Sequence, residues 1–407
     1  MTPQTWRYLQ SRQGAVATTL AIGSIIAFLF VYYGRSNGGI IRFQVSQEAG
    51  PPNPVNTVKS AKHVASSSEI KQRFDMRRQR LRDVCSRPEY QQPDLGVDFS
   101  TFRYDWVAFR RLRWCRVAKV GTTFMKSKFF PQTQLQSLNY NKAMLNYLSK
   151  HPKTFYFVRD PYSRLLSGYL DKLVTSPERW GDIGRIVIRS QRRNAKPREI
   201  ECGSDATFLE FFRYVIWAET TNKTRNIHFL PMHDLCDVCK RDFDYIGHLE
   251  TIKEDLPYIL SSVGVKMDIS ENTTKEIINK VENIFDENSK LVRRCLGIYP
   301  MMQRLWWMLQ ARGLIADAMP LPASRSDVEA ASTPQLASWA VEAHHNTQAM
   351  GKQSAQKRKF RVDMFRHIPL QLRLKFLELY SKDFQLFQYE PLPSDFFPEL
   401  NNVINDH

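Results

Sequence analysis

Two short segments of this chain carry side chains and turns of the kind that bind phosphate groups. The first, residues 115–123, reads Cys-Arg-Val-Ala-Lys-Val-Gly-Thr-Thr, and we expect it to end a strand, turn through a tight loop and open a helix. Backbone N–H groups at a helix start, the positive end of the helix dipole, a lysine ammonium and hydroxyls all favour a bound anion. The segment therefore predicts a phosphate cradle. Its members are Lys119, Val120, Gly121, Thr122 and Thr123.

The second segment, residues 158–169, predicts another phosphate-binding turn. It reads Val-Arg-Asp-Pro-Tyr-Ser-Arg-Leu-Leu-Ser-Gly-Tyr, with Arg159 at the end of an apolar strand and Ser167 on the helix that follows. An arginine fork and a hydroxyl that converge on one anion suit a phosphate. Each segment alone is weak evidence, because the first lacks the full Gly-x-x-x-x-Gly-Lys-Ser/Thr loop and Arg-Asp-Pro is a common turn. Together they favour the two halves of one nucleotide-phosphate site.

The ordered pair resembles the 5′-phosphosulfate and 3′-phosphate motifs of sulfotransferases. The chain is identified as a member of the Golgi carbohydrate sulfotransferases, the family that includes the chondroitin and dermatan 4-O-sulfotransferases. Further segments similar to the family's motifs follow in the family's order and cover 80–85, 226–239, 243–251 and 377–389. The first motif departs from the family's Pro-Lys-Val-Ala-Cys-Thr-Asn-Trp, because Ala118 replaces the proline, Thr122 the cysteine, and Phe and Met the last two residues.

The resemblance implies a co-substrate and a mechanism. Sulfotransferases use 3′-phosphoadenosine 5′-phosphosulfate (PAPS), from which a sulfuryl group moves to an acceptor hydroxyl. Such transfer parallels phosphoryl transfer, since positioning and electrostatics supply most of the catalysis, and it requires no metal. Lys119 would then stabilise charge on the bridging oxygen and the leaving phosphate, while Arg159 and Ser167 would hold the 3′-phosphate.

The catalytic base is a separate question. His228 begins the block that is similar to the family's His-Trp motif, although Phe229 stands where the family has tryptophan. An imidazole with an ordinary pKa of about 6.5 is suited to proton transfer at lumenal pH. Glu250 and His233 are the alternatives. We expect Arg164 either to orient the acceptor or to cover its helix with its apolar stem.

These residues need elements that hold them, and the chain predicts an α/β fold. Strand-like and helix-like segments alternate from about residue 80, which favours a parallel sheet flanked by helices. The resemblance implies a fold similar to P-loop nucleotide-binding proteins. The predicted strands cover 113–117, 154–158 and 245–247. The predicted helices cover 123–130, 163–173, 208–217, 255–263 and 370–387, the last with Leu374, Leu377, Phe384 and Phe387 at core spacing.

We expect one large domain behind a single N-terminal transmembrane helix. The predicted parts are a cytoplasmic tail (1–13), a transmembrane signal-anchor (14–33), a stem (34–75), the sulfotransferase domain (76–390) and a C-terminal tail (391–407). Residues 14–33 carry no charge and would span roughly 30 Å as a helix, about one hydrocarbon core. A cleaved signal peptide is the alternative, although the bulky end of this run is a poor cleavage site. The predicted topology is single-pass type II.

Downstream residues suggest that the domain lies in the Golgi lumen. Asn222 and Asn272 each begin a glycosylation acceptor sequence. The 6 cysteines are even in number and suit an oxidising compartment. Cys236 and Cys239 have the spacing of half a zinc site, but no second pair completes it. We therefore favour disulfides, either within this pair or with distant partners.

Residues from about 290 to 356 fall where the family's pattern is shorter, so we expect an insertion. Three interpretations stay open at this point: a lid on the acceptor side, a disordered loop, and intron-derived sequence from a wrong gene prediction.

The formal net charge of +17 at pH 7 predicts anionic partners. A lumenal domain does not meet nucleic acid, so the expected partners are PAPS, a glycosaminoglycan or other glycan acceptor, and the membrane. Much of the charge is clustered, and each cluster is equally well explained as a solvated face. The clusters cover 71–82, 110–116 and 185–198.

The resemblance implies a PAPS-dependent carbohydrate sulfotransferase, with GalNAc 4-O-sulfation of chondroitin- or dermatan-type chains as the specific reaction. A first alternative is a catalytically inactive relative that binds sulfated glycans in the lumen. A second is a P-loop kinase-like enzyme. The kinase is disfavoured because no Walker-type Lys-Ser/Thr pair and no acidic partner for Mg²⁺ is apparent.

Overall fold

The computed structural model describes residues 65–90, 111–129, 152–266, 269–270, 272–351 and 353–399, together with the backbone alone of 104–107 and 400. The predicted cytoplasmic tail, the signal-anchor over 14–33 and most of the stem lie outside these residues, so they stay predictions. Among the helices that the structure does describe, none has both the length and the apolar character needed to cross a membrane.

One sheet of four strands forms the centre of the α/β part. Its strands are β1 (Tyr104–Val107), β2 (Leu112–Cys115), β3 (Lys153–Val158) and β4 (Tyr245–His248), in that spatial order. Strands β2, β3 and β4 are parallel, and β1 pairs antiparallel with β2. The side chains of 155–158 are buried on both faces of β3, as expected for a strand covered by helices on both sides. The predicted parallel sheet is confirmed, whereas the antiparallel edge strand was not predicted.

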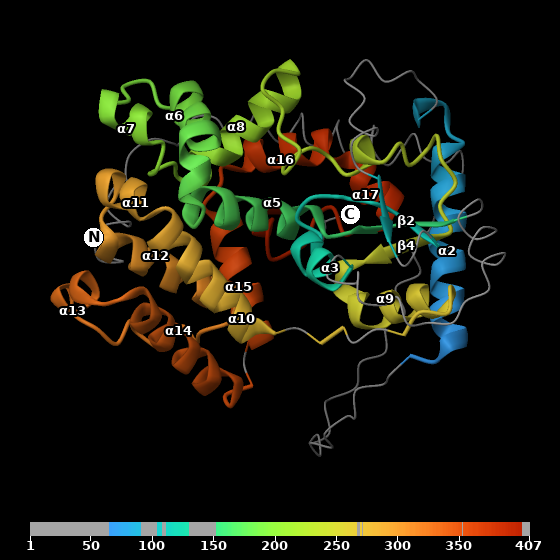
Figure 1. The fold of residues 1–407 in the computed structure, drawn as a ribbon. Helices are drawn as coiled ribbons and strands as arrows, with labels where there is room; N and C mark the ends of the chain where they lie inside the picture. The colour runs from blue at the N-terminus through green and yellow to red at the C-terminus, as the bar shows by residue number, and fades with distance from the viewer. Residues whose placement is uncertain are drawn as a thin grey trace, which may run out of the picture. The chain divides into compact units, whose positions relative to one another are not determined.

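Helices α2 (Ser67–Cys85) and α9 (Ile252–Ser261) pack beside β4 (Figure 1). Helix α2 places Ile70 and Phe74 in the core, so packed structure begins before residue 76. Asp255 of α9 is fully buried and accepts hydrogen bonds from Arg77 at 2.7 Å and Arg73 at 3.1 Å. These two arginines of the first basic cluster therefore stabilise the fold, because a buried carboxylate requires paired cations.

The helices that position the predicted site residues follow the strands directly. Helix α3 (Thr122–Phe129) follows β2, and α5 (Pro161–Tyr169) follows β3 and continues into a π-helical turn, Leu170–Val174. Asp160 caps α5 because its carboxylate accepts the Ser163 N–H, and Pro161 fits the first helical position. Helix α8 (Phe208–Thr221) begins with a capping box.

The predicted terminal helix is present as two helices, α16 (Leu370–Leu379) and α17 (Ser381–Phe387), separated at Tyr380. Leu377, Phe384 and Phe387 are buried, as their spacing predicted. The core extends into the predicted C-terminal tail, because Phe396 and Phe397 are buried too.

The stretch that we expected to be an insertion forms packed helices. Its elements are α11 (Ser289–Cys295), α12 (Ile298–Ala311), α13 (Arg325–Ala330), α14 (Thr333–Gln348) and the start of α15 (Gln353–Arg366). Met301, Met302 and Leu305 of α12 are fully buried. Helix α14 packs along α10 (Thr273–Glu282), and α12 packs against the π-helical turn after α5 (Figure 1). A disordered loop is therefore the wrong interpretation of this stretch.

Three disulfides cross-link distant parts of the chain. They join Cys85 to Cys239, Cys115 to Cys236, and Cys202 to Cys295. Cys236 and Cys239 thus pair with distant partners rather than with each other, and the zinc alternative is wrong. Through these two bonds, the segment around 236–239 is attached to both α2 and β2, whereas the third bond joins α7 (Pro197–Cys202) to α11.

Candidate functional site

The two predicted phosphate segments meet at one edge of the sheet. Parallel strands end at the same edge, so the loops after β2, β3 and β4 are neighbours there. Arg159 Nη1, after β3, donates a hydrogen bond to the carbonyl oxygen of Lys119, after β2, at 3.2 Å. The backbone N–H of Asp160 donates to Glu250 Oε1, after β4, at 3.0 Å. The fold therefore connects all three loops directly.

The loop after β2 has an unusual backbone. Lys119 has a φ of 70° and Gly121 a φ of 80°, both in the left-handed region that L side chains rarely adopt. At Gly121 a Cβ atom would lie 2.9 Å from Leu249 Cδ1, so a larger residue meets both strain and a close contact. A strained lysine held in place by its surroundings is typical of a functional loop.

The same loop leaves donors free at the start of α3. Thr122 Oγ1 donates to the Val117 carbonyl at 2.6 Å and so closes the loop, whereas Thr123 is exposed. The side chain of Val120 is fully buried, which leaves only its backbone for binding. In the described part of the chain, the N–H groups of 120–123 donate to no acceptor. This arrangement suits an anion.

Lys119 belongs to a group of charges that we call the Asp171 cluster. Asp171 Oδ2 lies 2.7 Å from Lys119 Nζ and 3.1 Å from Lys172 Nζ, and Asp171 Oδ1 lies 3.5 Å from Lys280 Nζ. All four side chains are mostly buried, with exposed fractions between 13% and 21%. One carboxylate thus faces three ammonium groups, which leaves a net positive charge at a place of low solvent access.

The pKa values of the cluster reflect this imbalance. Burial lowers the pKa of Lys119 to about 7, against the opposing charge of Asp171 and with a further contribution from Arg312. Burial disfavours the Asp171 anion, but the charges of Lys119, Lys280 and Lys172 outweigh burial and hold its pKa well below the usual range. A second anion near Lys119 would favour its charged form.

Arg159 and Ser167 keep groups available for a ligand. Arg159 is half-buried, and burial lowers the pKa of its guanidinium against the opposing charges of Glu250 and Asp160. Its bond to the Lys119 carbonyl is its one hydrogen bond within the described residues, so the remaining N–H groups of the fork are free there. Ser167 is also half-buried, and its hydroxyl has no partner in the ranges described.

His228 lies within electrostatic reach of the Asp171 cluster. Its Nδ1 and its backbone N lie 2.8 Å and 3.0 Å from Asn226 Oδ1, so Nδ1 carries the proton and Nε2 keeps a lone pair. Burial, with the charges of Lys172 and Lys119 next in size, lowers the pKa of His228 to about 3. The imidazole is therefore neutral in the unliganded protein.

Gly168 of α5 allows the segment that contains His228 to lie close against this helix. At Gly168 a Cβ atom would lie 2.8 Å from Phe229 Cε1 and 3.7 Å from the His228 carbonyl oxygen. The position therefore excludes a larger residue. Close packing of Phe229 against α5 brings His228 near the turn that carries Asp171.

The two alternative bases already have structural partners. His233 Nδ1 lies 2.8 Å from Asp383 Oδ1, and Nε2 lies 3.1 Å from Asp234 Oδ1. Although burial opposes it, these carboxylates raise the pKa of His233. Both carboxylate oxygens of Glu250 accept hydrogen bonds, one from a backbone N–H and one from Tyr389 at 2.9 Å. Both alternatives are therefore engaged in structural contacts, whereas His228 Nε2 has no hydrogen-bond partner among the described residues.

Arg164 has neither of the two roles that we predicted for it. Its side chain is 2% exposed, and burial lowers the pKa of the guanidinium. Nε donates to the Ala118 carbonyl at 2.9 Å, and Nη1 donates to the Leu230 carbonyl at 2.6 Å. Arg164 therefore connects the loop of Lys119 to the segment of His228 and fixes their spacing.

The third basic cluster is only partly available to a ligand. Arg192 forms ion pairs with Glu210 at 2.7 Å, Asp205 at 2.8 Å and Glu199 at 3.4 Å, a group that we call the Arg192 cluster. The hydrogen bond that Arg192 donates to Glu210 is the largest cause of the raised pKa of Arg192. In contrast, the exposed members of the basic cluster are Arg189, Arg193, Lys196 and Arg198.

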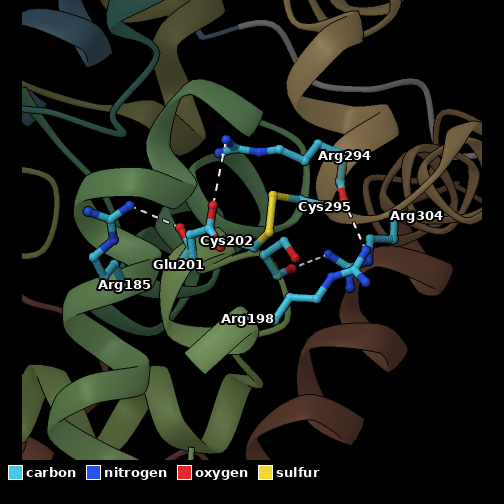
Figure 2. Close-up of a disulfide and its surroundings, with 8 residues drawn as sticks. Arg185, Arg198, Glu201, Cys202, Arg294, Cys295 and Arg304 are labelled. Carbon is cyan, nitrogen blue, oxygen red and sulfur yellow. Dashed lines mark hydrogen bonds and ion pairs between the residues drawn. A yellow bond between two sulfur atoms is a disulfide. The ribbon is translucent and has the colours of Figure 1, made fainter. Parts of the chain in front are cut away.

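Figure 2 shows Arg185 and Arg198, two further members of the third basic cluster, beside the third disulfide. Arg185 Nη2 donates to the Glu201 carbonyl at 2.9 Å, and Arg198 Nη2 donates to the Arg294 carbonyl at 3.1 Å (Figure 2). These two arginines therefore support the junction between α7 and α11 around the Cys202–Cys295 bond.

Sequence reasoning missed several members of the site. Asp171 could have been predicted from the sequence, because it lies one helical turn after Ser167 and therefore on the same face of the helix. Lys280 on α10 and Arg312 after α12 come from segments without a motif, so only the tertiary fold brings them near Lys119. No group of three His, Cys, Asp or Glu side chains in the described ranges is arranged to hold a metal ion.

Comparison with known proteins finds similarity over part of the chain. Residues 104–296 match the sulfotransferase family. The carbohydrate sulfotransferase 10 of Xenopus laevis is 35% identical over 150 residues, which cover 33% of this chain and 41% of that protein. The carbohydrate sulfotransferase 14 of Mus musculus is 28% identical over 221 residues, covering 49% and 58%. The carbohydrate sulfotransferase 11 of Mus musculus is 35% identical over 137 residues, covering 32% and 38%.

The matched region therefore spans between 38% and 58% of the length of these three relatives. No solved structure matches the chain.

Proposed function

Since residues 104–296 match the sulfotransferase family and the chain is similar to carbohydrate sulfotransferases, we propose that this protein transfers a sulfuryl group from PAPS to a hydroxyl group of a glycan. The observation that carries the proposal is the meeting of the two phosphate segments at one sheet edge, beside the positive Asp171 cluster. A ligand with negative charge at both ends would compensate both parts of this site.

The residues present fit the two anionic ends of PAPS. We propose that Lys119, Thr123 and the free N–H groups of the loop bind the 5′-phosphosulfate, as donors at a helix start do for other oxyanions. The unused N–H groups of Arg159 and the hydroxyl of Ser167 would bind the 3′-phosphate. Binding of the 3′-phosphate would distinguish PAPS from ATP.

In the proposed reaction, His228 and Lys119 act at the two ends of the transferred group. His228 Nε2 accepts the proton of the acceptor hydroxyl while the new S–O bond forms and the S–O bond to the phosphate breaks. The Lys119 ammonium stabilises the negative charge that collects on the leaving phosphate. PAPS supplies the sulfuryl group when it is bound.

The low pKa of His228 is consistent with this role. In the unliganded protein, burial and the charges of Lys172 and Lys119 lower it to about 3, which would make a weak base. A bound polyanion offsets those lysine charges and so raises the pKa of His228. The base would therefore gain strength only when the co-substrate is present.

We further propose that the acceptor is a glycosaminoglycan, with GalNAc 4-O-sulfation of chondroitin- or dermatan-type chains as the specific reaction. The exposed cations of the third basic cluster, Arg189, Arg193 and Lys196, are available to bind carboxylates and sulfates of such a chain. The choice of position 4 on GalNAc rests on the sequence resemblance alone.

For the location we propose the Golgi membrane, with single-pass type II topology and a lumenal domain. Three disulfides and the exposed Asn222 and Asn272 of the glycosylation sequences support it. Glycosidase treatment of protein from cells should then increase its gel mobility, and an Asn222→Gln, Asn272→Gln double variant should lose this shift. An unglycosylated protein whose C-terminal part is digested by protease in sealed microsomes would contradict the topology.

One experiment separates the proposed function from its alternatives. The full-length protein is incubated with a panel of glycans and either ³⁵S-labelled PAPS or γ-labelled ATP. Label transferred from PAPS to a glycan supports the sulfotransferase, and label transferred from ATP supports the kinase. Binding of sulfated glycans without transfer from either donor would support the inactive relative and refute the enzyme.

A further inference from the structure

The Asp171 cluster contains more positive charge than Lys119 alone would bring. Lys172 and Lys280 have Asp171 as their one carboxylate partner among the described residues, and Lys280 also donates to Ser176 Oγ at 3.2 Å. With its contact of 3.5 Å, Lys280 is the most weakly attached of the three ammonium groups. A mostly buried cation without a full counter-ion is costly unless an anion binds beside it.

A fourth cation, Arg312, is fixed near this cluster by a well-built turn. Gly313 has a φ of 62°, and a Cβ atom there would lie 2.8 Å from the Gln353 carbonyl oxygen. Gln356 Nε2 donates to the Gln310 carbonyl at 2.6 Å and to the Ile315 carbonyl at 2.8 Å. The backbone on both sides of Arg312 is therefore held by α15.

Arg312 lies within electrostatic reach of other cations. Its side chain is half-buried and has no hydrogen bond or ion pair with any residue that the structure describes. Helix α12, which ends just before it, packs against the π-helical turn that carries Asp171 and Lys172. The charge of Arg312 contributes to the lowered pKa values of Lys119, Arg159 and Lys280, so its field reaches both phosphate segments.

We propose that Lys280 and Arg312 form a second wall of the co-substrate site and bind the 5′-phosphosulfate end of PAPS together with Lys119. The assignment to this end follows from the carboxylate that Lys280 shares with Lys119, the lysine of the first phosphate segment. A multiply charged oxyanion would satisfy an ammonium group and a guanidinium group that otherwise repel each other. The inference rests on the proposed function.

The second wall gives a role to part of the chain that has no family motif. Residues 104–296 match the sulfotransferase family, and Arg312 lies beyond that match, in the stretch that we expected to be an insertion. Helices α12 and α15 hold the turn of Arg312 in place. These helices would then complete the nucleotide site.

Calorimetric titration of the full-length protein tests the second wall. The probes are adenosine 3′,5′-bisphosphate, which has phosphates at both ends, and adenosine 3′-monophosphate, which lacks the 5′ charge. Lys280→Ala and Arg312→Ala should each raise the Kd of the bisphosphate roughly tenfold or more, as expected for a lost charge-assisted hydrogen bond, and leave the Kd of the monophosphate unchanged. Lys280→Arg and Arg312→Lys should keep most of the affinity.

The matched control is Lys275→Ala, which removes an exposed lysine from the same helix as Lys280 and should change neither Kd. Equal loss of affinity for both nucleotides would overturn the assignment to the 5′ end. Unchanged nucleotide affinity with a raised KM for the glycan would overturn it too, because the wall would then bind the acceptor. If the unmodified protein binds neither nucleotide, the proposed function itself fails. If it binds the bisphosphate and both alanine variants bind equally well, only the second wall is wrong.

Discussion

The Arg192 cluster and the Asp171 cluster are opposite in charge and alike in layout. One guanidinium meets Glu199, Asp205 and Glu210 in the first, and one carboxylate meets Lys119, Lys172 and Lys280 in the second. The Asp171 cluster is mostly buried, whereas the side chains of the Arg192 cluster are 15% to 40% exposed. Their surroundings differ, and this difference separates a structural cluster from a binding site.

The Arg192 cluster is compensated by the fold itself. Glu210 lies in the first turn of α8 and Glu199 in the first turn of α7, where helix N-termini add positive partial charge. Around Asp171, the nearby groups add to the imbalance, because Arg312 is a cation and the loop before α3 presents free N–H groups. Charge that the protein leaves uncompensated in a partly buried place therefore indicates where an anionic ligand binds.

The strongest test of this contrast is Lys119→Ala. We expect kcat to fall roughly 100-fold or more, as when a donor to the transition state is lost. The melting temperature should not fall, because Asp171 keeps two ammonium partners. Lys126→Ala, at an exposed position of α3, the helix that follows the loop of Lys119, is the control and should keep full activity. A Lys119→Ala variant with near-normal kcat would remove the catalytic role of the Asp171 cluster.

The reverse result is expected for Arg192→Ala. Breaking a buried ion pair costs about 3–5 kcal/mol, and since Arg192 is 20% exposed we expect a loss of about 2–3 kcal/mol in the free energy of unfolding. The activity of each folded molecule should be unchanged. Chemical denaturation measures the first quantity, with the exposed Arg193→Ala as a control that should change stability by less than about 0.5 kcal/mol. Unchanged stability in Arg192→Ala would refute its structural role.

The pH dependence of nucleotide binding sharpens the comparison. The pKa of Lys119 is lowered to about 7, chiefly by burial, and an anion binds the protonated form. Above pH 7 a proton must be taken up on binding, so the affinity for adenosine 3′,5′-bisphosphate should fall, at most about tenfold per pH unit. Titrations between about pH 7.5 and 9 avoid the ionisation of the phosphates, whose pKa is about 6.

Lys119→Arg provides the control for this pH profile, because a guanidinium stays charged over the whole range. Its affinity should be nearly independent of pH. An unmodified protein with an equally flat profile would show that Lys119 is already fully charged before the nucleotide binds.

The smallest effect is expected at the exposed surface. Replacing Arg189, Arg193 and Lys196 together by alanine should raise the KM for a glycosaminoglycan about threefold to tenfold, since exposed charge pairs contribute little individually. PAPS affinity should not change, and the acceptor affinity of the unmodified protein should fall as salt rises. Arg192 stays out of this set because its ion pairs are internal. An unchanged KM would mean that these residues are only a solvated face.

The sequence predicted those parts of the site that consist of a strand, its loop and the next helix. Lys119 and Arg159 were predicted in this way because each follows a buried strand, and the parallel sheet brings their two segments together. Helix α12 could also have been predicted from the sequence, although no family motif covers it. Its apolar residues have helical spacing: Met301, Met302, Leu305 and Leu309.

Other features depend on contacts between distant segments. No local pattern links Lys280 or Arg312 to Lys119, and the partners of Cys236 and Cys239 could not be chosen among the pairings that six cysteines allow. The charge pattern also could not separate Arg192 from the exposed members of its cluster, because its sequence neighbours are basic, while its spatial neighbours Asp205 and Glu210 are acidic.

The first two disulfides have a consequence for how a cell makes this protein. Cys85 and Cys115 are synthesised well before Cys236 and Cys239. Neither early thiol can form its native disulfide until its later partner has been synthesised. Because the two late partners are close in sequence, exchanging them gives a second, incorrect pair of bridges between the same segments. Correction requires thiol–disulfide exchange through a mixed disulfide. We therefore expect the yield of mature protein to depend on the disulfide isomerase capacity of the host cell, whereas each correctly paired molecule is equally active.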